Sequence, residues 1–273
     1  MVKKLLAILF IFLITNTVFA GNLIALYDPG QEDGIVNPYL DRNVSCLSVN
    51  IEDITFPLYK SQDKYLSHGD LVLRTLQKFN RDDTYLIIGC NNINDDFNLK
   101  KAMNYAYEKE AKIFLITFGV PLENDLLYKF NAQLWYTLFE YCKKCPNMLI
   151  VCSAGNDGKF LDEQINLQDK PSNLIIVGSC NVKGYISEFS DYGQVVDVYT
   201  LGENIKILLD THNGTSFSAP VIVNYCSKIL DNFPNDRPQD IKNKLLTFAN
   251  NKKIFLNEEI IQICANDDKM YKN

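Results

Sequence analysis

Ser216 has sequence neighbours that could make its hydroxyl reactive. The segment HNGTSFSAP (212–220) places Ser216 behind Asn-Gly-Thr and at the start of an apolar run that the spacing predicts as a helix. The backbone N–H groups at a helix start stabilise a negative charge that develops beside them. A serine in this position acts as a nucleophile when a base takes its proton. The alternative is structural, because Thr215 or Ser216 can simply cap the helix.

The chain holds only two histidines that could serve as this base, His68 and His212. His68 stands in SHGD at the start of a predicted helix, where Gly69 lets another backbone approach closely. His212 lies four residues before Ser216, and we expect it either to line the same cleft or to be exposed. A histidine on a separate element can face Ser216 across a cleft, so we prefer His68 as the base.

A carboxylate and an amide would complete a catalytic group with this serine and histidine. The base needs a carboxylate that holds its tautomer and stabilises the imidazolium. Asp28 ends a predicted buried strand in LYDPG, although Asp-Pro-Gly is also a frequent turn sequence. Asn156, in SAGNDG, can offer its side-chain amide to an oxyanion, and a plain turn asparagine is the alternative.

The elements that must position these residues alternate along the chain. Short runs rich in Ile, Leu and Val are typical of buried strands and occupy 22–27, 84–90, 112–118, 147–154 and 173–180. Longer amphipathic segments predict helices at 67–79, 97–110, 124–143, 216–231 and 238–249. Because such strands pair in parallel through right-handed crossovers, we predict an α/β fold: a doubly wound, mostly parallel sheet with helices on both faces. Active sites in such sheets gather at the carboxyl ends of the strands, where Asp28 and Asn156 fall.

The composition fits one domain and excludes some partners. The chain has 273 residues, of which 47% are hydrophobic and 22% charged, and this length can bury one large core. The net charge is −6, the pI is about 5.1 and no Lys/Arg-rich run is present, so we expect no nucleic-acid partner.

The first twenty residues have the pattern of a signal peptide. Lys3 and Lys4 precede an apolar run over 5–14, and Val18-Phe19-Ala20 suits a signal peptidase. We therefore expect cleavage near Ala20, a mature domain over 21–273 and a secreted or periplasmic location. The alternative is a membrane anchor, but the run is shorter than the ~20 residues that span a bilayer.

Eight cysteines leave the redox state open. They lie at positions 46, 90, 142, 145, 152, 180, 226 and 264, and an exported chain could pair them in 105 ways. Cys152, Cys180 and Cys226 fall in predicted buried elements, where free thiols explain them at least as well. Cys142 and Cys145 form a lone C-x-x-C, which is a local disulfide or at best half a zinc site, so we expect no metal.

Taken together, these segments resemble the subtilisin-like serine proteases (subtilases, peptidase S8 family). LYDPG, SHGD, VCSAGNDG and NGTSFSAP resemble that family's Asp, His, oxyanion-Asn and Ser blocks, in the family's order. The resemblance runs from about residue 22 to the end of the chain. It implies a subtilisin-like three-layer sandwich and a serine endopeptidase in which Asp28 orients, His68 transfers protons and Ser216 attacks. Asn156 and the N–H of Ser216 would hold the oxyanion.

The resemblance also implies where substrate lies. Thr117-Phe118-Gly119 and Ser153-Ala154-Gly155 would flank the first specificity pocket and pair with an extended peptide as an added strand. The expected partner is a peptide or protein substrate, with no cofactor and with a monomeric enzyme. Structural calcium is not supported, because the segment after His68 is too short for the family's tight site and NNINDD (91–96) lacks a recognised calcium spacing.

Several positions depart from the family pattern. Asp70 replaces the usual Thr after His68-Gly69, and a carboxylate there is expected to raise the pKa of His68 and shift the pH–rate profile to alkaline pH. Pro29 follows the Asp, and Phe217 replaces the usual Met after the Ser. No inhibitory pro-domain fits between Ala20 and Asp28, which implies folding without one or a separate folding helper or inhibitor.

These departures keep an alternative function open, an exported pseudoprotease that binds extended peptides in the same cleft. The combination of Asp28, His68, Asn156 and Ser216 argues against it, because binding alone does not require them together. An α/β-hydrolase esterase is excluded. Residues 214–218 lack the second glycine of G-x-S-x-G, and no histidine follows the serine.

Overall fold

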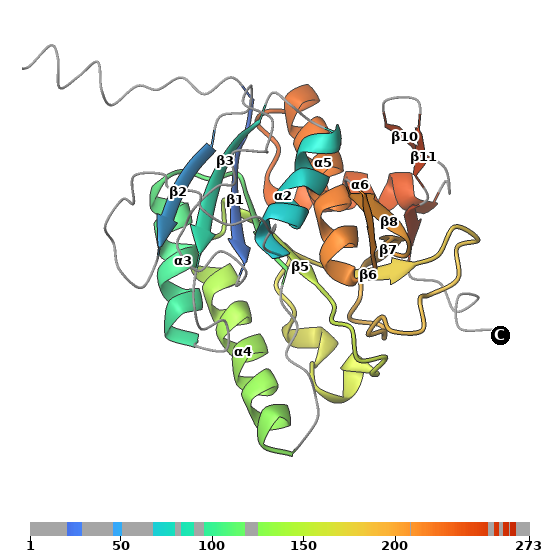
Figure 1. Cartoon of the computed structure of the whole chain (residues 1–273). Helices are drawn as coiled ribbons and strands as arrows, with labels where there is room; N and C mark the ends of the chain where they lie inside the picture. The colour runs from blue at the N-terminus through green and yellow to red at the C-terminus, as the bar shows by residue number, and fades with distance from the viewer. Residues whose placement is uncertain are drawn as a thin grey trace, which may run out of the picture.

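A computed structural model of the chain describes residues 21–28, 46–50, 68–79, 83–89, 96–117, 125–207, 209–250, 254–256, 259–261 and 263–265 (Figure 1). Within these ranges, side chains are described except at 46–50, 79, 125–132, 250 and 254–265. The expected signal peptide, Pro29 and residues 91–95 lie outside the described residues.

A large sheet forms the centre of the molecule. Its strands, in spatial order, are β12 (Ile263–Ala265), β7 (Val198–Leu201), β6 (Leu174–Cys180), β5 (Leu149–Ser153), β4 (Ile113–Ile116), β1 (Leu23–Asp28), β3 (Thr84–Gly89) and β2 (Cys46–Asn50). All neighbouring pairs are parallel except β12 with β7. The five predicted strands are confirmed to within a few residues at each end. Strands β2, β7 and β12 were not predicted.

Helices cover both faces of the sheet (Figure 1). They are α2 (His68–Phe79), α3 (Asp96–Glu108), α4 (Asp125–Lys144), α5 (Thr215–Asn232) and α6 (Pro238–Asn250), which match the five predicted segments. One buried cluster joins the sheet to α3 and α4, and a second joins it to α2, α5 and α6. This is the doubly wound α/β fold that the alternation of strands and helices predicts.

The sheet is hydrophobic on both sides because it is covered on both sides. Strands β1, β3, β4, β5 and β6 are buried along their whole length. Side chains on alternate positions of a strand point to opposite faces, so strands buried on both faces have continuous apolar sequences rather than alternating ones. This explains why short Ile-, Leu- and Val-rich runs predict the strands well.

Strand β1 lies where the chain changes direction across the sheet. It pairs with β3 on one side and with β4 on the other, so the chain passes from β3 across β1 to reach β4. Ligands of open α/β sheets bind at such a switch point, outside the carboxyl ends of the strands. Asp28 is the last residue of β1 and stands at this edge.

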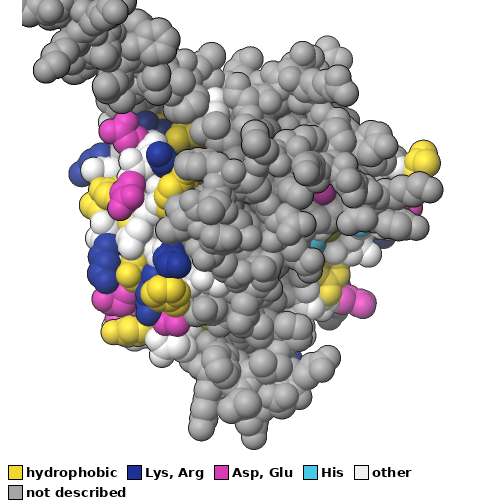
Figure 2. Space-filling model, turned by 60° about the vertical axis from the view of Figure 1, so that its left-hand side comes forward, with side chains coloured by type: hydrophobic (Ala, Val, Ile, Leu, Met, Phe, Trp, Pro, Cys, Tyr) yellow, Lys and Arg dark blue, Asp and Glu magenta, His cyan; other side chains and the backbone are white. Residues whose placement is uncertain are grey.

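The described surface has mixed charge. Figure 2 shows Lys, Arg, Asp, Glu and hydrophobic side chains intermixed on the described part of one face. Among the described helices, none is long and apolar enough to cross a membrane.

Candidate active site

Asp28 and His68 meet at the carboxyl end of β1. His68 is the first residue of α2, and its Nδ1 lies 2.9 Å from Oδ2 and 3.2 Å from Oδ1 of Asp28. Asp28 is fully buried, while 39% of the His68 side chain is exposed. An ionised carboxylate can only accept hydrogen bonds, so Nδ1 carries the proton and Nε2 is left as the basic nitrogen.

A second donor holds the same carboxylate. The hydroxyl of Thr117, directly after β4, donates to Oδ2 of Asp28. Thr117 is 2% exposed, and β4 is the neighbour of β1 in the sheet. The sequence singles out Thr117 only as a substrate-binding residue. Its contact with Asp28 depends on strands 89 residues apart in sequence lying side by side, so no local signal reveals it.

The pKa of His68 is raised above its ordinary value of 6.5. Burial is the largest influence and lowers it, but the hydrogen bond and the Coulombic attraction of Asp28 together outweigh burial. The direction agrees with the expectation from the sequence. The cause does not, since Asp28 and not Asp70 raises the pKa. Asp70 lies in the first turn of α2, as expected, and is 4% exposed.

This balance makes a prediction about two carboxylates. In the Ser216→Ala background, Asp28→Asn is expected to bring the pKa of His68 below 6.5, because only burial then remains, whereas Asp70→Asn leaves it unchanged. NMR titration of the histidine ring protons measures this, and a His212→Gln variant assigns the two signals. A fall in the pKa of His68 in the Asp70→Asn variant would show that Asp70 also raises this pKa.

The same pKa fixes the sign of the pH dependence. A base works when it is neutral, so activity is lost as pH falls through the pKa of His68. We therefore expect the acid limb of kcat/KM to lie above pH 6.5.

Ser216 stands at the head of α5 and does not cap it. Its Oγ donates to the backbone carbonyl of Thr117 at 3.0 Å, and the residue is 5% exposed. Gly214 is the N-cap and has no side-chain cap bond. The helix-cap interpretation of Thr215 and Ser216 is therefore wrong. Thr117 thus contacts both Asp28 and Ser216, which brings three of the predicted residues together with His68.

Asn156 supplies the cap of α5 from another part of the chain. Its Oδ1 accepts hydrogen bonds from the backbone N–H of Thr215 at 2.8 Å and from the Thr215 hydroxyl at 3.0 Å. With Oδ1 bound in this way, Nδ2 is the donor end of the amide and has no acceptor among the described residues, and Asn156 is exposed. Gly214, with φ of 153°, lies against this amide, since a Cβ there would be 3.6 Å from Nδ2. The amide of Asn156 therefore lies beside the N-cap of α5, two residues before Ser216.

Phe217 packs against both histidines. Its ring centroid lies 6.0 Å from that of His68 and 5.6 Å from that of His212. His212 ends β9 (Asp210–His212), which pairs with β8 (Ile205–Ile207). Both histidines therefore lie near Ser216, but the described contacts connect only His68 to a buried carboxylate.

The predicted substrate segments leave neighbouring strands at the same edge. Thr117 follows β4, and Ser153 ends β5, which pairs with β4 in parallel. Thr117, Ser153 and Ala154 are all buried, so contact with a peptide there would use their backbone groups. Gly155 follows with φ of +119°. Phe118 and Gly119 lie outside the described residues.

The five cysteines whose side chains the structure describes are free. Cys142, Cys145, Cys152, Cys180 and Cys226 are buried thiols. The free-thiol interpretation therefore holds for the three that fall in core elements, and it also applies to the C-x-x-C pair in place of a local disulfide. Burial raises the pKa of Cys152 to about 12 and that of Cys145 to about 11.

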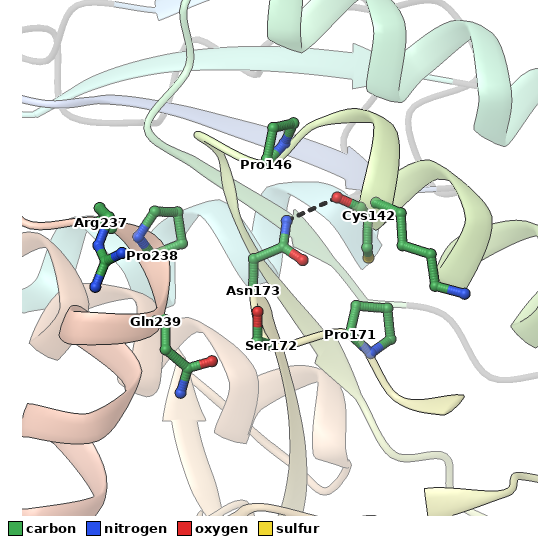
Figure 3. A pocket seen from close by; sticks show the side chains of 9 residues that line it. Cys142, Pro146, Pro171, Ser172, Asn173, Arg237, Pro238 and Gln239 are labelled. Carbon is green, nitrogen blue, oxygen red and sulfur yellow. Dashed lines mark hydrogen bonds between the residues drawn. The ribbon is translucent and has the colours of Figure 1, made fainter. Parts of the chain in front are cut away.

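A pocket of about 360 Å³ lies elsewhere (Figure 3). It is lined by the end of α4, the segment before β6 and the start of α6. Asn173, which lines it, donates from Nδ2 to the carbonyls of Cys142, Cys145 and Met148. The pocket opens at the amino end of β6, so it shares no residue with the site around Asp28.

Comparison with known proteins connects this geometry to a family. The model of the Subtilase family matches residues 87–260, more than half of the chain. This range includes Asn156 and Ser216, while Asp28 and His68 precede it.

Two curated relatives cover shorter stretches. The major intracellular serine protease of Bacillus subtilis (strain 168) is 31% identical over 125 residues, and the match covers 43% of this chain and 36% of that protein. A subtilisin-like protease 2 of Arthroderma otae is 33% identical over 31% of this chain and 22% of its own length. The chain therefore matches between about a fifth and just over a third of these relatives' length.

A solved structure shares the fold. A cold-adapted subtilisin-like serine proteinase superposes with a TM-score of 0.60 at 17% identity, covering 87% of this chain and 85% of that one. The subtilisin-like form of the α/β sandwich is therefore confirmed.

Proposed function

The chain belongs to the subtilase family, and from this membership we propose that it is a serine endopeptidase acting through Asp28, His68 and Ser216. The observation that carries the proposal is the contact of His68 with the buried carboxylate of Asp28, beside a serine at a helix head. A chain that only binds peptides has no need of a histidine held in one tautomer. This supports the peptidase over the pseudoprotease.

In the proposed reaction, the Ser216 hydroxyl leaves the carbonyl of Thr117 and turns toward Nε2 of His68. His68 takes the proton as Oγ attacks the peptide carbonyl, and Asp28 stabilises the imidazolium. His68 then gives the proton to the departing amine, which leaves an acyl group on Ser216. A water molecule, deprotonated by His68, attacks the acyl group, and His68 then returns this proton to Oγ of Ser216 as the bond to the acyl group breaks and the second product leaves.

Two donors would hold the oxyanion that forms in each step. One is Nδ2 of Asn156, whose Oδ1 is held by Thr215. The other is the N–H of Ser216, which belongs to the first turn of α5 and has no acceptor within the helix. Both donors are held before substrate arrives, so they need little reorganisation during the reaction.

We propose further that the substrate is an extended peptide with an apolar residue before the cut, and that the chain is exported after cleavage near Ala20. It would act as a monomer without a cofactor, and a separate protein would serve as folding helper or inhibitor. The family membership supports the first of these, and the pattern of residues 1–20 supports the second.

A fluorophosphonate probe tests the proposed nucleophile. The chain, expressed with its own N-terminal segment, is treated with the probe and the label is located by peptide mass mapping. We expect label on Ser216, because only a serine whose proton a neighbouring base can take, beside oxyanion donors, reacts readily.

Two variants make this result specific. Ser216→Ala should lose the label. Ser218→Ala should keep it, although Ser218 lies on the same helix and also donates to a backbone carbonyl, that of Thr200, at 3.1 Å. A folded chain without label on Ser216 would reject the peptidase and favour the peptide-binding alternative.

A further inference from the structure

A buried carboxylate lies beneath the loop that carries Asn156 and takes no part in the steps above. Asp191 is 4% exposed. Its Oδ1 accepts the backbone N–H of Asp157 at 3.0 Å and that of Lys159 at 2.8 Å. We call residues 155–159 the Asn156 loop. One oxygen of Asp191 therefore holds two of the three residues that follow Asn156.

Asp191 also contacts Gly155, the residue that precedes Asn156. The backbone N–H of Asp191 donates to the carbonyl of Gly155 at 3.0 Å. Gly155 lies directly on the carboxylate, since a Cβ there would be 2.2 Å from Oδ2 of Asp191. With its φ of +119°, this position favours glycine for its backbone as well as for its size. Asp191 thus contacts the loop on both sides of Asn156.

These contacts matter because, in the part of the chain that the structure describes, the side chain of Asn156 bonds only to Thr215. Its exposed side chain is held at Oδ1 by Thr215, so the direction of Nδ2 depends on that bond and on the backbone of the loop. An oxyanion donor stabilises charge only when it lies within hydrogen-bond distance of the place where that charge develops. A small shift of the loop would therefore reduce its effect.

We propose that Asp191 is a positioning residue that fixes the Asn156 loop and so aims the oxyanion donor. The inference rests on the proposed peptidase function and adds a residue to it. Burial raises the pKa of Asp191 to about 6, so near neutral pH the side chain is mainly a carboxylate. Hydrogen bonds from backbone N–H groups to a charged acceptor are stronger than those to a neutral one.

The chain offers a matched control in Asp162. This carboxylate also accepts two backbone N–H groups, from Gln194 at 2.8 Å and from Val195 at 3.0 Å. It also lies under a glycine of positive φ, since a Cβ on Gly193 would be 2.5 Å from its Oδ1. Asp162 therefore anchors a different loop by the same kind of contact.

Steady-state kinetics on a chromogenic peptide test the inference. Asp191→Ala is expected to lower kcat about 10- to 100-fold with KM within about twofold, which is less than the ~10²–10³-fold effect of losing an oxyanion donor outright. Affinity for a peptide aldehyde, which forms a tetrahedral adduct with the serine, should fall by the same factor. Asp191→Asn keeps the accepting oxygen and should recover most of kcat. Asp162→Ala should change neither quantity.

A double variant separates positioning from general damage. In an Asn156→Ala background, Asp191→Ala should lower kcat by no more than about twofold further, because the donor that it aims is already gone. An equal loss in both backgrounds would overturn the inference. If Asp191→Ala does not fold, Asp191→Ser takes its place, since its shorter oxygen cannot reach both N–H groups.

Hydrogen exchange separates this inference from the proposed function. The amides of Asp157 and Lys159 should exchange at least tenfold faster in Asp191→Ala than in the parent chain, and at the parent rate in Asp162→Ala. A parent chain without Ser216-dependent turnover would reject the peptidase, and the exchange rates would still decide whether Asp191 fixes the loop. Unchanged exchange, or full kcat in a folded Asp191→Ala variant, would reject the role of Asp191.

Discussion

Alanine in place of His68 is expected to lower kcat about 10⁶-fold, whereas alanine in place of His212 should leave it within about tenfold. The larger figure is the loss that subtilisin, the type member of this family, shows when its serine or histidine is removed alone. The two histidines make a demanding comparison, because both rings pack on Phe217 at similar distances. They differ in that Nδ1 of His68 lies 2.9 Å from the buried carboxylate of Asp28.

The measurement is kcat on a peptide substrate, with circular dichroism to show that both variants are folded. A residual rate should remain in His68→Ala, since the oxyanion donors and substrate binding act without the base. A large loss in His212→Ala with a small one in His68→Ala would assign the base to His212, and an equal large loss in both would contradict the assignment of the base to His68 alone. A mild loss in both would remove histidine from the mechanism, and the peptidase proposal with it.

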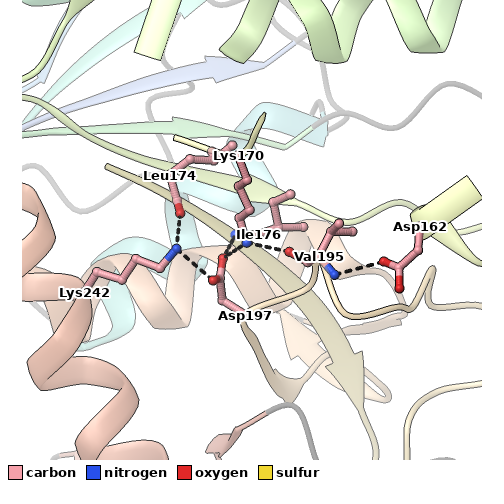
Figure 4. A network of polar contacts seen from close by, with 7 residues as sticks. All are labelled: Asp162, Lys170, Leu174, Ile176, Val195, Asp197 and Lys242. Carbon is pink, nitrogen blue, oxygen red and sulfur yellow. Dashed lines mark hydrogen bonds and ion pairs between the residues drawn. The ribbon is translucent and has the colours of Figure 1, made fainter. Parts of the chain in front are cut away.

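Alanine in place of Asp197 is expected to lower the free energy of unfolding by about 3–5 kcal/mol, because it leaves two buried lysines without their counter-charge. Nζ of Lys170 lies 2.5 Å from Oδ2 of Asp197, and Nζ of Lys242 lies 2.8 Å from its Oδ1 (Figure 4). The three side chains are between 5% and 11% exposed. Asp197 also accepts the backbone N–H of Ile176, within β6, at 2.8 Å.

The pKa of Lys170 shows that this buried cluster disfavours the charge of its side chain. Burial lowers the pKa of Lys170 to about 8, although the attraction of Asp197 opposes the change. Two positive charges share one carboxylate, so removing Lys170 leaves a balanced pair of Asp197 with Lys242. We expect Lys170→Met to cost much less stability than Asp197→Ala.

Urea unfolding followed by fluorescence measures both changes. The control is Glu140→Ala, which removes an exposed pair with Lys143 and should cost about 0–1 kcal/mol. Equal losses for Asp197→Ala and Glu140→Ala would show that water reaches the lysines. A larger loss for Lys170→Met than for Asp197→Ala would mean that Asp197 needs both lysines.

The candidate residues of the site could be selected from the sequence because the signals that mark them are local. Asp28 follows an apolar run, His68 and Ser216 each precede a helical one, and Asn156 lies in a glycine-bounded turn. A strand end or a helix head is defined by the few residues around it. Periodicity located the central strands and the helices for the same reason, since a covered strand or an amphipathic helix shows its burial along its own length.

Strands β2, β7 and β12 gave no such signal. They lie toward the edges of the sheet. The sequences of β2 (CLSVN) and β7 (VYTL) contain polar residues instead of a continuous apolar run, and β12 (ICA) has only three residues. Their pairing depends on the neighbouring strand that is already in place. The β12 strand, for example, joins β7 antiparallel from more than sixty residues away.

What the sequence by itself determined is the order of strands and helices and the identity of the residues that could react. Only the tertiary structure decided what holds those residues. The hydroxyl of Thr117 binds Asp28, and Thr215 binds Asn156. Asp191 binds the backbone of the Asn156 loop. The partners in these contacts are 34 to 89 residues apart in sequence. The reason is physical: a hydrogen bond depends on distance in space, and the packing of the sheet and its helices sets which distant residues come within about 3 Å.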